Sequence, residues 1–169
     1  MRSKMCKYIP ERYTQAELYA PENFWITLKE NPLALEEICN GVGSRLSWTY
    51  HLTPDTIWLL DVSPAADIHD WMYTFPVVFP YEENGEMFWT GEEYRAHSDR
   101  VFLNNMYRLF NLADSRSWIS RRVRPFRNTR ALSYYTILRN CGGPSFWSDK
   151  NKPEILGQLL NTNKIKDAV

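Results

Sequence analysis

The chain has 169 residues and a mass of 20.0 kDa, a size that suits one domain around one hydrophobic core. Hydrophobic residues make up 44% and charged residues 24%, so disorder of the whole chain is excluded. No apolar run approaches the roughly 18 residues of a spanning helix. The basic amino end is not followed by an apolar stretch, so we expect no signal peptide. Twenty basic and twenty acidic residues give no net charge, which disfavours nucleic acid as a partner. We expect a single domain over residues 1–169.

Three cysteines are too few and too widely spaced for a disulfide framework or a CxxC metal pair: Cys6, Cys39 and Cys141. We therefore expect free thiols and a reducing, cytoplasmic location. A thiol hydrolase built on Cys39 and a histidine is the weaker alternative, because nothing local marks this cysteine as activated.

The first predicted helix is short and covers 33–39, after an asparagine N-cap and a proline at the first helical position. A glycine-bearing loop at 39–44 and an irregular stretch as far as Asp61 follow. A second helix over 63–73 opens in the same way, with a serine followed by a proline.

The segment 75–89 predicts a β-hairpin, because Asn84-Gly85 stands between two apolar runs. A third helix begins after Thr90, which forms a capping-box pattern with Glu93, and continues to about Phe110.

The remaining chain predicts a basic loop over 115–128, a helix over 131–140 and a last short helix opened by Pro153. These elements indicate a mainly α fold. A small β-hairpin lies between two helices, and additional helices follow toward the carboxyl end.

Two polar residues lie on apolar helical stripes. His69 shares its face with Ala65, Met72 and Tyr73, and Asp99 shares its face with Phe102, Leu103, Met106 and Phe110. A carboxylate on such a face is costly unless it is paired and hydrogen-bonded. If the hairpin folds the two helices antiparallel, Asp99 pairs with His69 and accepts the Tyr73 hydroxyl. Such a pair fixes the imidazole tautomer, as a general base requires. A purely structural pair is the alternative, and periodicity alone favours it.

Asp70 follows His69 and can face the loop that contains Gly41 and Gly43. Backbone carbonyls and a carboxylate are the ligands that calcium requires. A helix-terminating loop and a solvated Asp70 form the alternative.

These residues resemble the motifs of the phospholipase A2 family. His69-Asp70-Trp71-Met72-Tyr73 is similar to its His-Asp-x-Cys-Tyr catalytic helix, and Asp99-Arg100 is similar to its Asp-Arg pair. Cys39-Asn40-Gly41-Val42-Gly43 resembles the family's calcium loop, and the hairpin over 75–89 stands where the family has a β-wing. The order of the motifs is the same. From 38 to 147 the chain looks like a bacterial and phage-associated group of phospholipase A2-like proteins of uncertain activity.

The resemblance implies a phospholipase A2-like pair of antiparallel helices and a calcium-dependent ester hydrolase that acts on glycerophospholipid. It implies that His69 activates water, that Asp99 holds the imidazole and that Tyr73 supports Asp99. The implied calcium ligands are the Asp70 side chain and the backbone carbonyls of Cys39, Gly41 and Gly43. A phage- or virion-associated location is also implied.

Two other functions fit the same residues. One is a non-enzymatic, phage- or bacteria-related interaction protein that retains the helical scaffold. The other is a hydrolase that uses the same dyad on a different ester or an amide.

The segment 115–148 contains seven arginines and no acidic residue. They are Arg116, Arg121, Arg122, Arg124, Arg127, Arg130 and Arg139. Because arginine suits bidentate contact with phosphate, the first six predict contact with an anionic surface, either lipid or nucleic acid, of which nucleic acid is the less favoured. A basic face that pairs with the acidic residues of the same molecule is an equal alternative.

Overall fold

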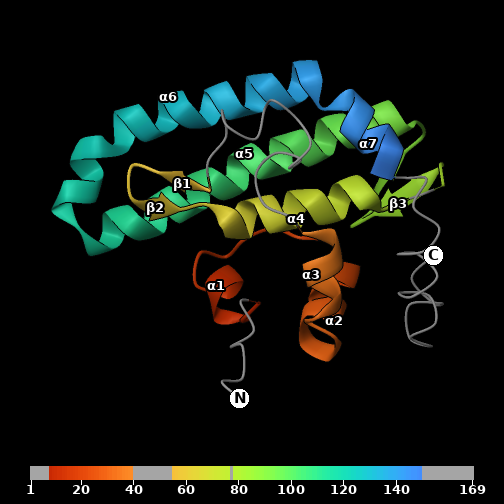
Figure 1. Ribbon diagram of the computed structural model, residues 1–169, viewed down its shortest axis with the longest axis horizontal. Helices are drawn as coiled ribbons and strands as arrows, with labels where there is room; N and C mark the ends of the chain where they lie inside the picture. Colours follow the sequence, from red (N-terminus) through yellow and green to blue (C-terminus); the bar gives the residue numbers. More distant parts are fainter. Residues whose placement is uncertain (1–7, 40–54, 77, 150–169) are drawn as a thin grey trace.

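The computed structural model describes residues 8–39, 55–76 and 78–149, and this part of the chain is mainly helical (Figure 1). The helices are α1 (Glu11–Thr14), α2 (Glu22–Glu30), α3 (Ala34–Ile38), α4 (Ser63–Thr74), α5 (Gly91–Arg116), α6 (Trp118–Cys141) and α7 (Gly143–Asp149). Two antiparallel hairpins join β1 (Thr56–Ile57) to β2 (Leu60–Asp61) and β3 (Tyr81–Glu83) to β4 (Glu86–Phe88).

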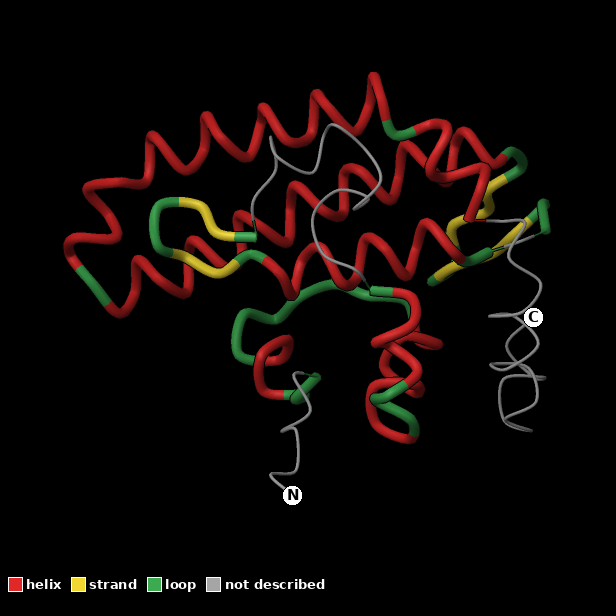
Figure 2. Tube along the Cα trace, in the orientation of Figure 1, coloured by secondary structure: helices red, strands yellow, loops and turns green. Residues whose placement is uncertain are grey.

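Three helices, α4, α5 and α6, lie side by side, and each runs opposite to the one before it (Figure 1). The β3–β4 hairpin connects α4 to α5. The β1–β2 hairpin lies near the opposite end of these helices (Figure 2). Helix α3 packs against α4, on the side away from α6 (Figure 1).

Helix α4 is the most enclosed of these elements, because ten of its twelve residues are buried. Trp71 packs against Phe24 of α2, with ring centroids 6.0 Å apart, and its indole N–H donates to Asn23 over 3.0 Å. A polar side chain on such a helix needs an internal partner, since water reaches little of its surface.

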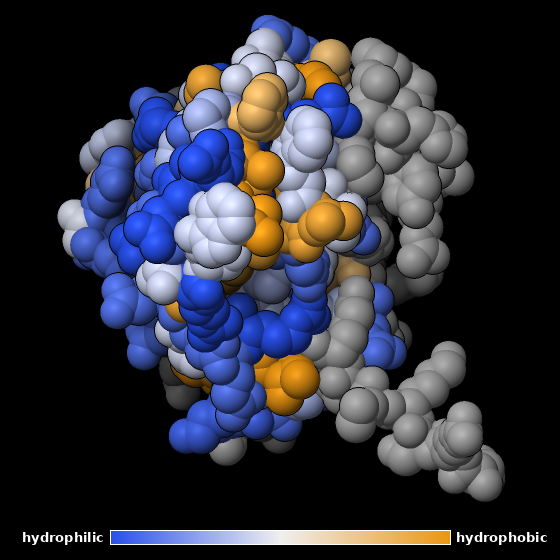
Figure 3. All heavy atoms as spheres, turned by 90° about the vertical axis from the view of Figure 1, so that its left-hand side faces the viewer, coloured by the Kyte–Doolittle hydropathy of each residue, from blue (hydrophilic) through white to orange (hydrophobic). Residues whose placement is uncertain are grey.

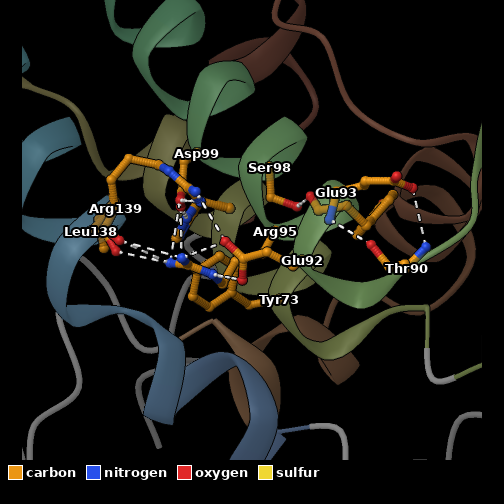
Figure 4. Close-up of polar contacts among 11 residues, drawn as sticks. Tyr73, Thr90, Glu92, Glu93, Arg95, Ser98, Asp99, Leu138 and Arg139 are labelled. Carbon is orange, nitrogen blue, oxygen red and sulfur yellow. Dashed lines mark hydrogen bonds and ion pairs between the residues drawn. The ribbon is translucent and has the colours of Figure 1, made fainter.

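The local signals that open α5 are confirmed. The Thr90 hydroxyl accepts from the Glu93 N–H, and the Glu93 carboxylate accepts from the Thr90 N–H (Figure 4). At the tip of the β3–β4 hairpin, Asn84 and Gly85 have φ values of 50° and 80°, the left-handed pair of a type I′ turn.

The predicted basic loop over 115–128 is wrong, because this segment is helical except at Ser117. Ser117 caps α6, and its side chain accepts from the Ser120 N–H. Helix α6 continues through Pro125. It does so because the arginines on either side of this proline are good helix formers and because the helix packs along α5.

Other predicted boundaries shift or lie outside the described residues. The helix expected over 33–39 is shorter, and α1 and α2 were not predicted. The helix expected after Pro153 lies outside the described ranges. Within these ranges no helix is long and apolar enough to cross a membrane.

Candidate active site

The predicted contact between α4 and α5 is confirmed. Nε2 of His69 lies 2.9 Å from Oδ1 of Asp99. The Asp99 side chain is fully buried and the His69 side chain is 6% exposed. The two helices thus place an imidazole and a carboxylate together in the interior.

Tyr73, one helical turn beyond His69, donates its hydroxyl to the same oxygen of Asp99 over 2.7 Å, as predicted. Its ring lies beside the imidazole, with centroids 4.0 Å apart. Burial and the charge of Asp99 raise the pKa of Tyr73 far above its usual value. The phenol therefore stays protonated and acts as a permanent donor.

Two arginines and a glutamate complete the surroundings of Asp99, and sequence reasoning missed all three (Figure 4). Arg139 of α6 donates to Oδ2 of Asp99 over 2.9 Å and to Glu92 over 3.0 Å. Arg95 forms two hydrogen bonds with Glu92, and its guanidinium lies 3.8 Å from Oδ2 of Asp99. Glu92, Arg95 and Asp99 are spaced three and four residues apart along one helix, and this spacing could have indicated that they interact.

These donors hold Asp99 in its ionised form. Burial by itself would raise the pKa of this carboxyl, but the hydrogen bonds from His69, Arg139 and Tyr73 lower it below the usual value. An ionised carboxylate accepts the N–H of Nε2, so Nδ1 of His69 keeps its lone pair. Within the described ranges Nδ1 has no hydrogen-bond partner, which leaves it available to accept a proton.

Gly142 allows the end of α6 to approach this cluster. A Cβ at this position would lie 2.7 Å from the Tyr73 hydroxyl and 2.6 Å from the Leu138 carbonyl oxygen. A Cβ added at the neighbouring Gly143 would have no atom within 4 Å of it. The absence of a side chain at Gly142 thus lets Tyr73 keep its contact with Asp99.

Two of the four expected calcium ligands lie in the described residues. Asp70 is partly buried on α4, and the Cys39 carbonyl follows α3 and accepts the Tyr8 hydroxyl over 3.1 Å. Burial is the main cause of the raised pKa of Tyr8, and the charge of Asp70 contributes.

A carboxylate and a backbone carbonyl are the kinds of oxygen ligand that calcium takes. The other two expected ligands, Gly41 and Gly43, lie outside the described residues. In the ranges that the structure describes, no three His, Cys, Asp or Glu side chains gather as a metal group.

Cys39 has the surroundings of a structural thiol. It is buried, and its Sγ donates to the Asp67 carbonyl over 3.2 Å. His69 pairs with Asp99 instead, so the geometry gives the thiol-hydrolase alternative no support. Cys39 and Cys141 are free thiols, as predicted, and Cys6 lies outside the described residues.

A second histidine–carboxylate pair connects the β3–β4 hairpin to α5. Nε2 of His97 lies 3.2 Å from Glu83, which also accepts the hydroxyls of Tyr19 and Tyr94. The His97 side chain is only 14% exposed, so this pair is largely enclosed.

The arginine-rich segment divides into two groups. Arg124 and Arg127 form ion pairs with Asp114, at 2.8 and 4.0 Å, and Arg139 belongs to the Asp99 cluster. Arg121 and Arg122 are exposed. Both alternatives are thus represented, since some arginines pair internally and others face solvent.

Comparison with known proteins gives no relative: no family model, curated protein or solved structure matches this chain.

Proposed function

We propose that this chain is a phospholipase A2-like ester hydrolase in which His69 activates water for attack on a glycerophospholipid. The observation that carries the proposal is the 2.9 Å contact between His69 Nε2 and the buried Asp99, combined with an Nδ1 that has no hydrogen-bond partner among the described residues. The order of the motifs along the chain adds support, because a hairpin separates the helix of His69 from the helix of Asp99.

The proton transfers follow from the tautomer. Nδ1 of His69 takes a proton from water, and the water oxygen bonds to the ester carbonyl carbon. Asp99 stabilises the resulting imidazolium through its contact with Nε2. When the tetrahedral intermediate collapses, Nδ1 returns the proton to the departing alkoxide. The products are a fatty acid and a lysophospholipid.

Asp99 stays ionised through this cycle because Arg139 binds its second oxygen and Tyr73 shares the first. Both residues act through Asp99, so they are positioning residues.

Calcium fits the proposal as a cofactor. Asp70 and the backbone carbonyls of Cys39, Gly41 and Gly43 would hold it. When bound, calcium would stabilise negative charge on the carbonyl oxygen of the ester.

A non-enzymatic interaction protein is the second candidate, and one observation favours it. Asp99 accepts from three side chains and the His69 side chain is only 6% exposed, as in a structural core pair. In that case the cluster stabilises the scaffold, and the biological activity lies on the surface.

A hydrolysis assay separates the two candidates. Phospholipid vesicles are incubated with the full chain in calcium, and released fatty acid is measured for wild type, His69→Gln and His97→Gln. His97 is the matched control, because it also pairs with a buried carboxylate of the same domain. The proposal expects a loss of about 100-fold or more for His69→Gln only. Absence of hydrolysis in wild type, or equal activity in all three, would contradict it.

A further inference from the structure

One end of the molecule exposes arginines and large apolar side chains together. It is formed by the tip of the β1–β2 hairpin and the first half of α6, which we call the arginine–aromatic end. Its members are Trp58, Leu59, Trp118, Ile119, Arg121, Arg122 and Phe126. This end faces the viewer in Figure 3, where hydrophobic side chains lie among hydrophilic ones.

The apolar members are unusually exposed. Leu59 is 102% exposed, Trp118 is 64% exposed and Ile119 is 57% exposed. Scattered exposed residues need no explanation, but several large ones at one end indicate an interaction site.

The hairpin tip places its side chains outward at a conformational cost. Trp58 and Leu59 have φ values of 47° and 63°, left-handed conformations that bulky residues rarely adopt. The β3–β4 hairpin makes the corresponding turn with Asn84-Gly85, which is the favoured pair. Backbone strain of this kind is found most often at functional positions.

The tip and α6 form one continuous surface. The ring centroids of Trp58 and Phe126 lie 5.4 Å apart, and Arg127 donates to the Trp58 carbonyl over 3.0 Å. Arg122 lies over the ring of Trp118, at 5.9 Å from its centroid. Aromatic and arginine side chains thus alternate along α6 at a spacing of four residues, which places Trp118, Arg122 and Phe126 on one ridge.

The α6 part of this surface is positively charged, and the exposed Asp61 of the β1–β2 hairpin is paired with Arg12. No acidic residue occurs between 115 and 148, and the nearby Asp114 is occupied by Arg124 and Arg127. Arg121 and Arg122 are exposed, and neither forms an ion pair with any residue in the described ranges.

We propose that the arginine–aromatic end docks on an anionic lipid surface. Arginine side chains bind lipid phosphates, and tryptophan side chains are favoured at the level of the lipid headgroups. In this arrangement Leu59 and Ile119 would insert into the acyl region. Exposed aliphatic side chains favour lipid over nucleic acid, because neither phosphate nor base stacking gives them a partner. The proposal requires only binding and is independent of hydrolysis.

A vesicle flotation assay with the full chain tests the proposal. The vesicles contain diether lipids, which carry no acyl ester, so binding is measured without hydrolysis by the proposed reaction. One set is purely zwitterionic and the other contains anionic phosphatidylglycerol. Two variants alter the surface, R121Q/R122Q and W58N/L59G. The control K29Q/R108Q removes the same charge from exposed residues of α2 and α5, outside the arginine–aromatic end.

Wild type and the control should bind the anionic vesicles and leave the zwitterionic ones unbound. The loss of two arginines should weaken binding about 25-fold, at about fivefold for each charge. The W58N/L59G variant should also lose most binding. Binding that is equal in all four proteins, or absent in wild type, overturns the proposal. Binding of a DNA or RNA oligonucleotide without vesicle binding overturns it in favour of a nucleic-acid partner.

Discussion

Arg139 donates through Nη1 to the one oxygen of Asp99 that His69 and Tyr73 leave unused, at 2.9 Å. The two residues lie 40 positions apart and meet because α6 runs back along α5. A buried carboxylate with one histidine partner would be poorly compensated. With Arg139 on its second oxygen, Asp99 keeps its charge and orients the imidazole.

Replacement of Arg139 by methionine should destabilise the fold. It leaves Oδ2 of Asp99 with only the more distant Arg95 near it, so the free energy of unfolding should fall by about 1–2 kcal/mol. The loss is small for a buried carboxylate because the Arg139 side chain is 26% exposed, so solvent screens its charge. Urea unfolding measures the change. Arg122→Met, on the exposed face of the same helix, should change the stability by less than about 0.5 kcal/mol. Equal effects in the two variants would contradict this role for Arg139.

The stability of the fold should decrease in acid because of Asp99. Its folded-state pKa is lowered, so it stabilises the fold above its unfolded pKa of about 3.9, and this contribution is lost as the pH falls through the folded pKa. Glu83 acts in the same direction, since its pKa is also lowered. Unfolding measured between about pH 2 and pH 7 should show the loss below about pH 4.

The variant Asp99→Asn isolates this contribution. It should be less stable than wild type at neutral pH, and its stability should decline less on acidification. A decline as steep as in wild type would show that other carboxylates cause the acid sensitivity.

A methyl group at Gly142 should disturb the site more than one at Gly143. The added Cβ would approach the Tyr73 hydroxyl and the Leu138 carbonyl, so Gly142→Ala should cost about 1–3 kcal/mol. It should also reduce any hydrolysis, because Tyr73 must move away from Asp99. Gly143→Ala meets open space and should leave both properties unchanged. Circular dichroism melting and the fatty-acid assay compare the two.

Local patterns predicted the dyad and its supporting tyrosine. His69 and Asp99 each interrupt an apolar stripe, and the Asn84-Gly85 turn between their helices allows these helices to fold back on each other. Burial requires a partner for each polar group, so the pairing could be predicted without knowledge of the packing details.

Arg139 and the β1–β2 hairpin could not be predicted in the same way. The position of Arg139 depends on how α6 packs against α5, and the arginines that precede it were interpreted as a loop. The turn at Trp58-Leu59 contains no glycine or asparagine, so it lacks the usual hairpin signal. Residue propensities do not predict a site whose residues adopt unfavourable backbone conformations.

The unusual turn predicts that W58N/L59G is more stable than wild type. An Asn-Gly pair adopts the left-handed conformations easily, and Leu59 has no burial to lose because it is fully exposed. The free energy of unfolding should rise by about 0.5–1 kcal/mol, reduced by the lost contact between Trp58 and Phe126. Urea unfolding measures it. A large loss of stability would show that the Trp58-Leu59 tip serves the fold itself.

The last prediction concerns calcium and Asp70. Asp70 provides one formal charge and the other expected ligands are neutral carbonyls, so affinity should be modest, with a Kd of about 10⁻⁴ to 10⁻³ M. Asp70→Asn should abolish the heat of calcium binding in titration calorimetry. The fold should persist, since Asp70 is only partly buried. Glu22→Gln, an exposed carboxylate on α2, is the control and should bind as wild type does. Equal heats in wild type and Asp70→Asn would exclude this calcium site, yet His69 and Asp99 would still form their pair. Calcium binding and proton transfer are therefore separable parts of the proposal, and only the second depends on the contact between α4 and α5.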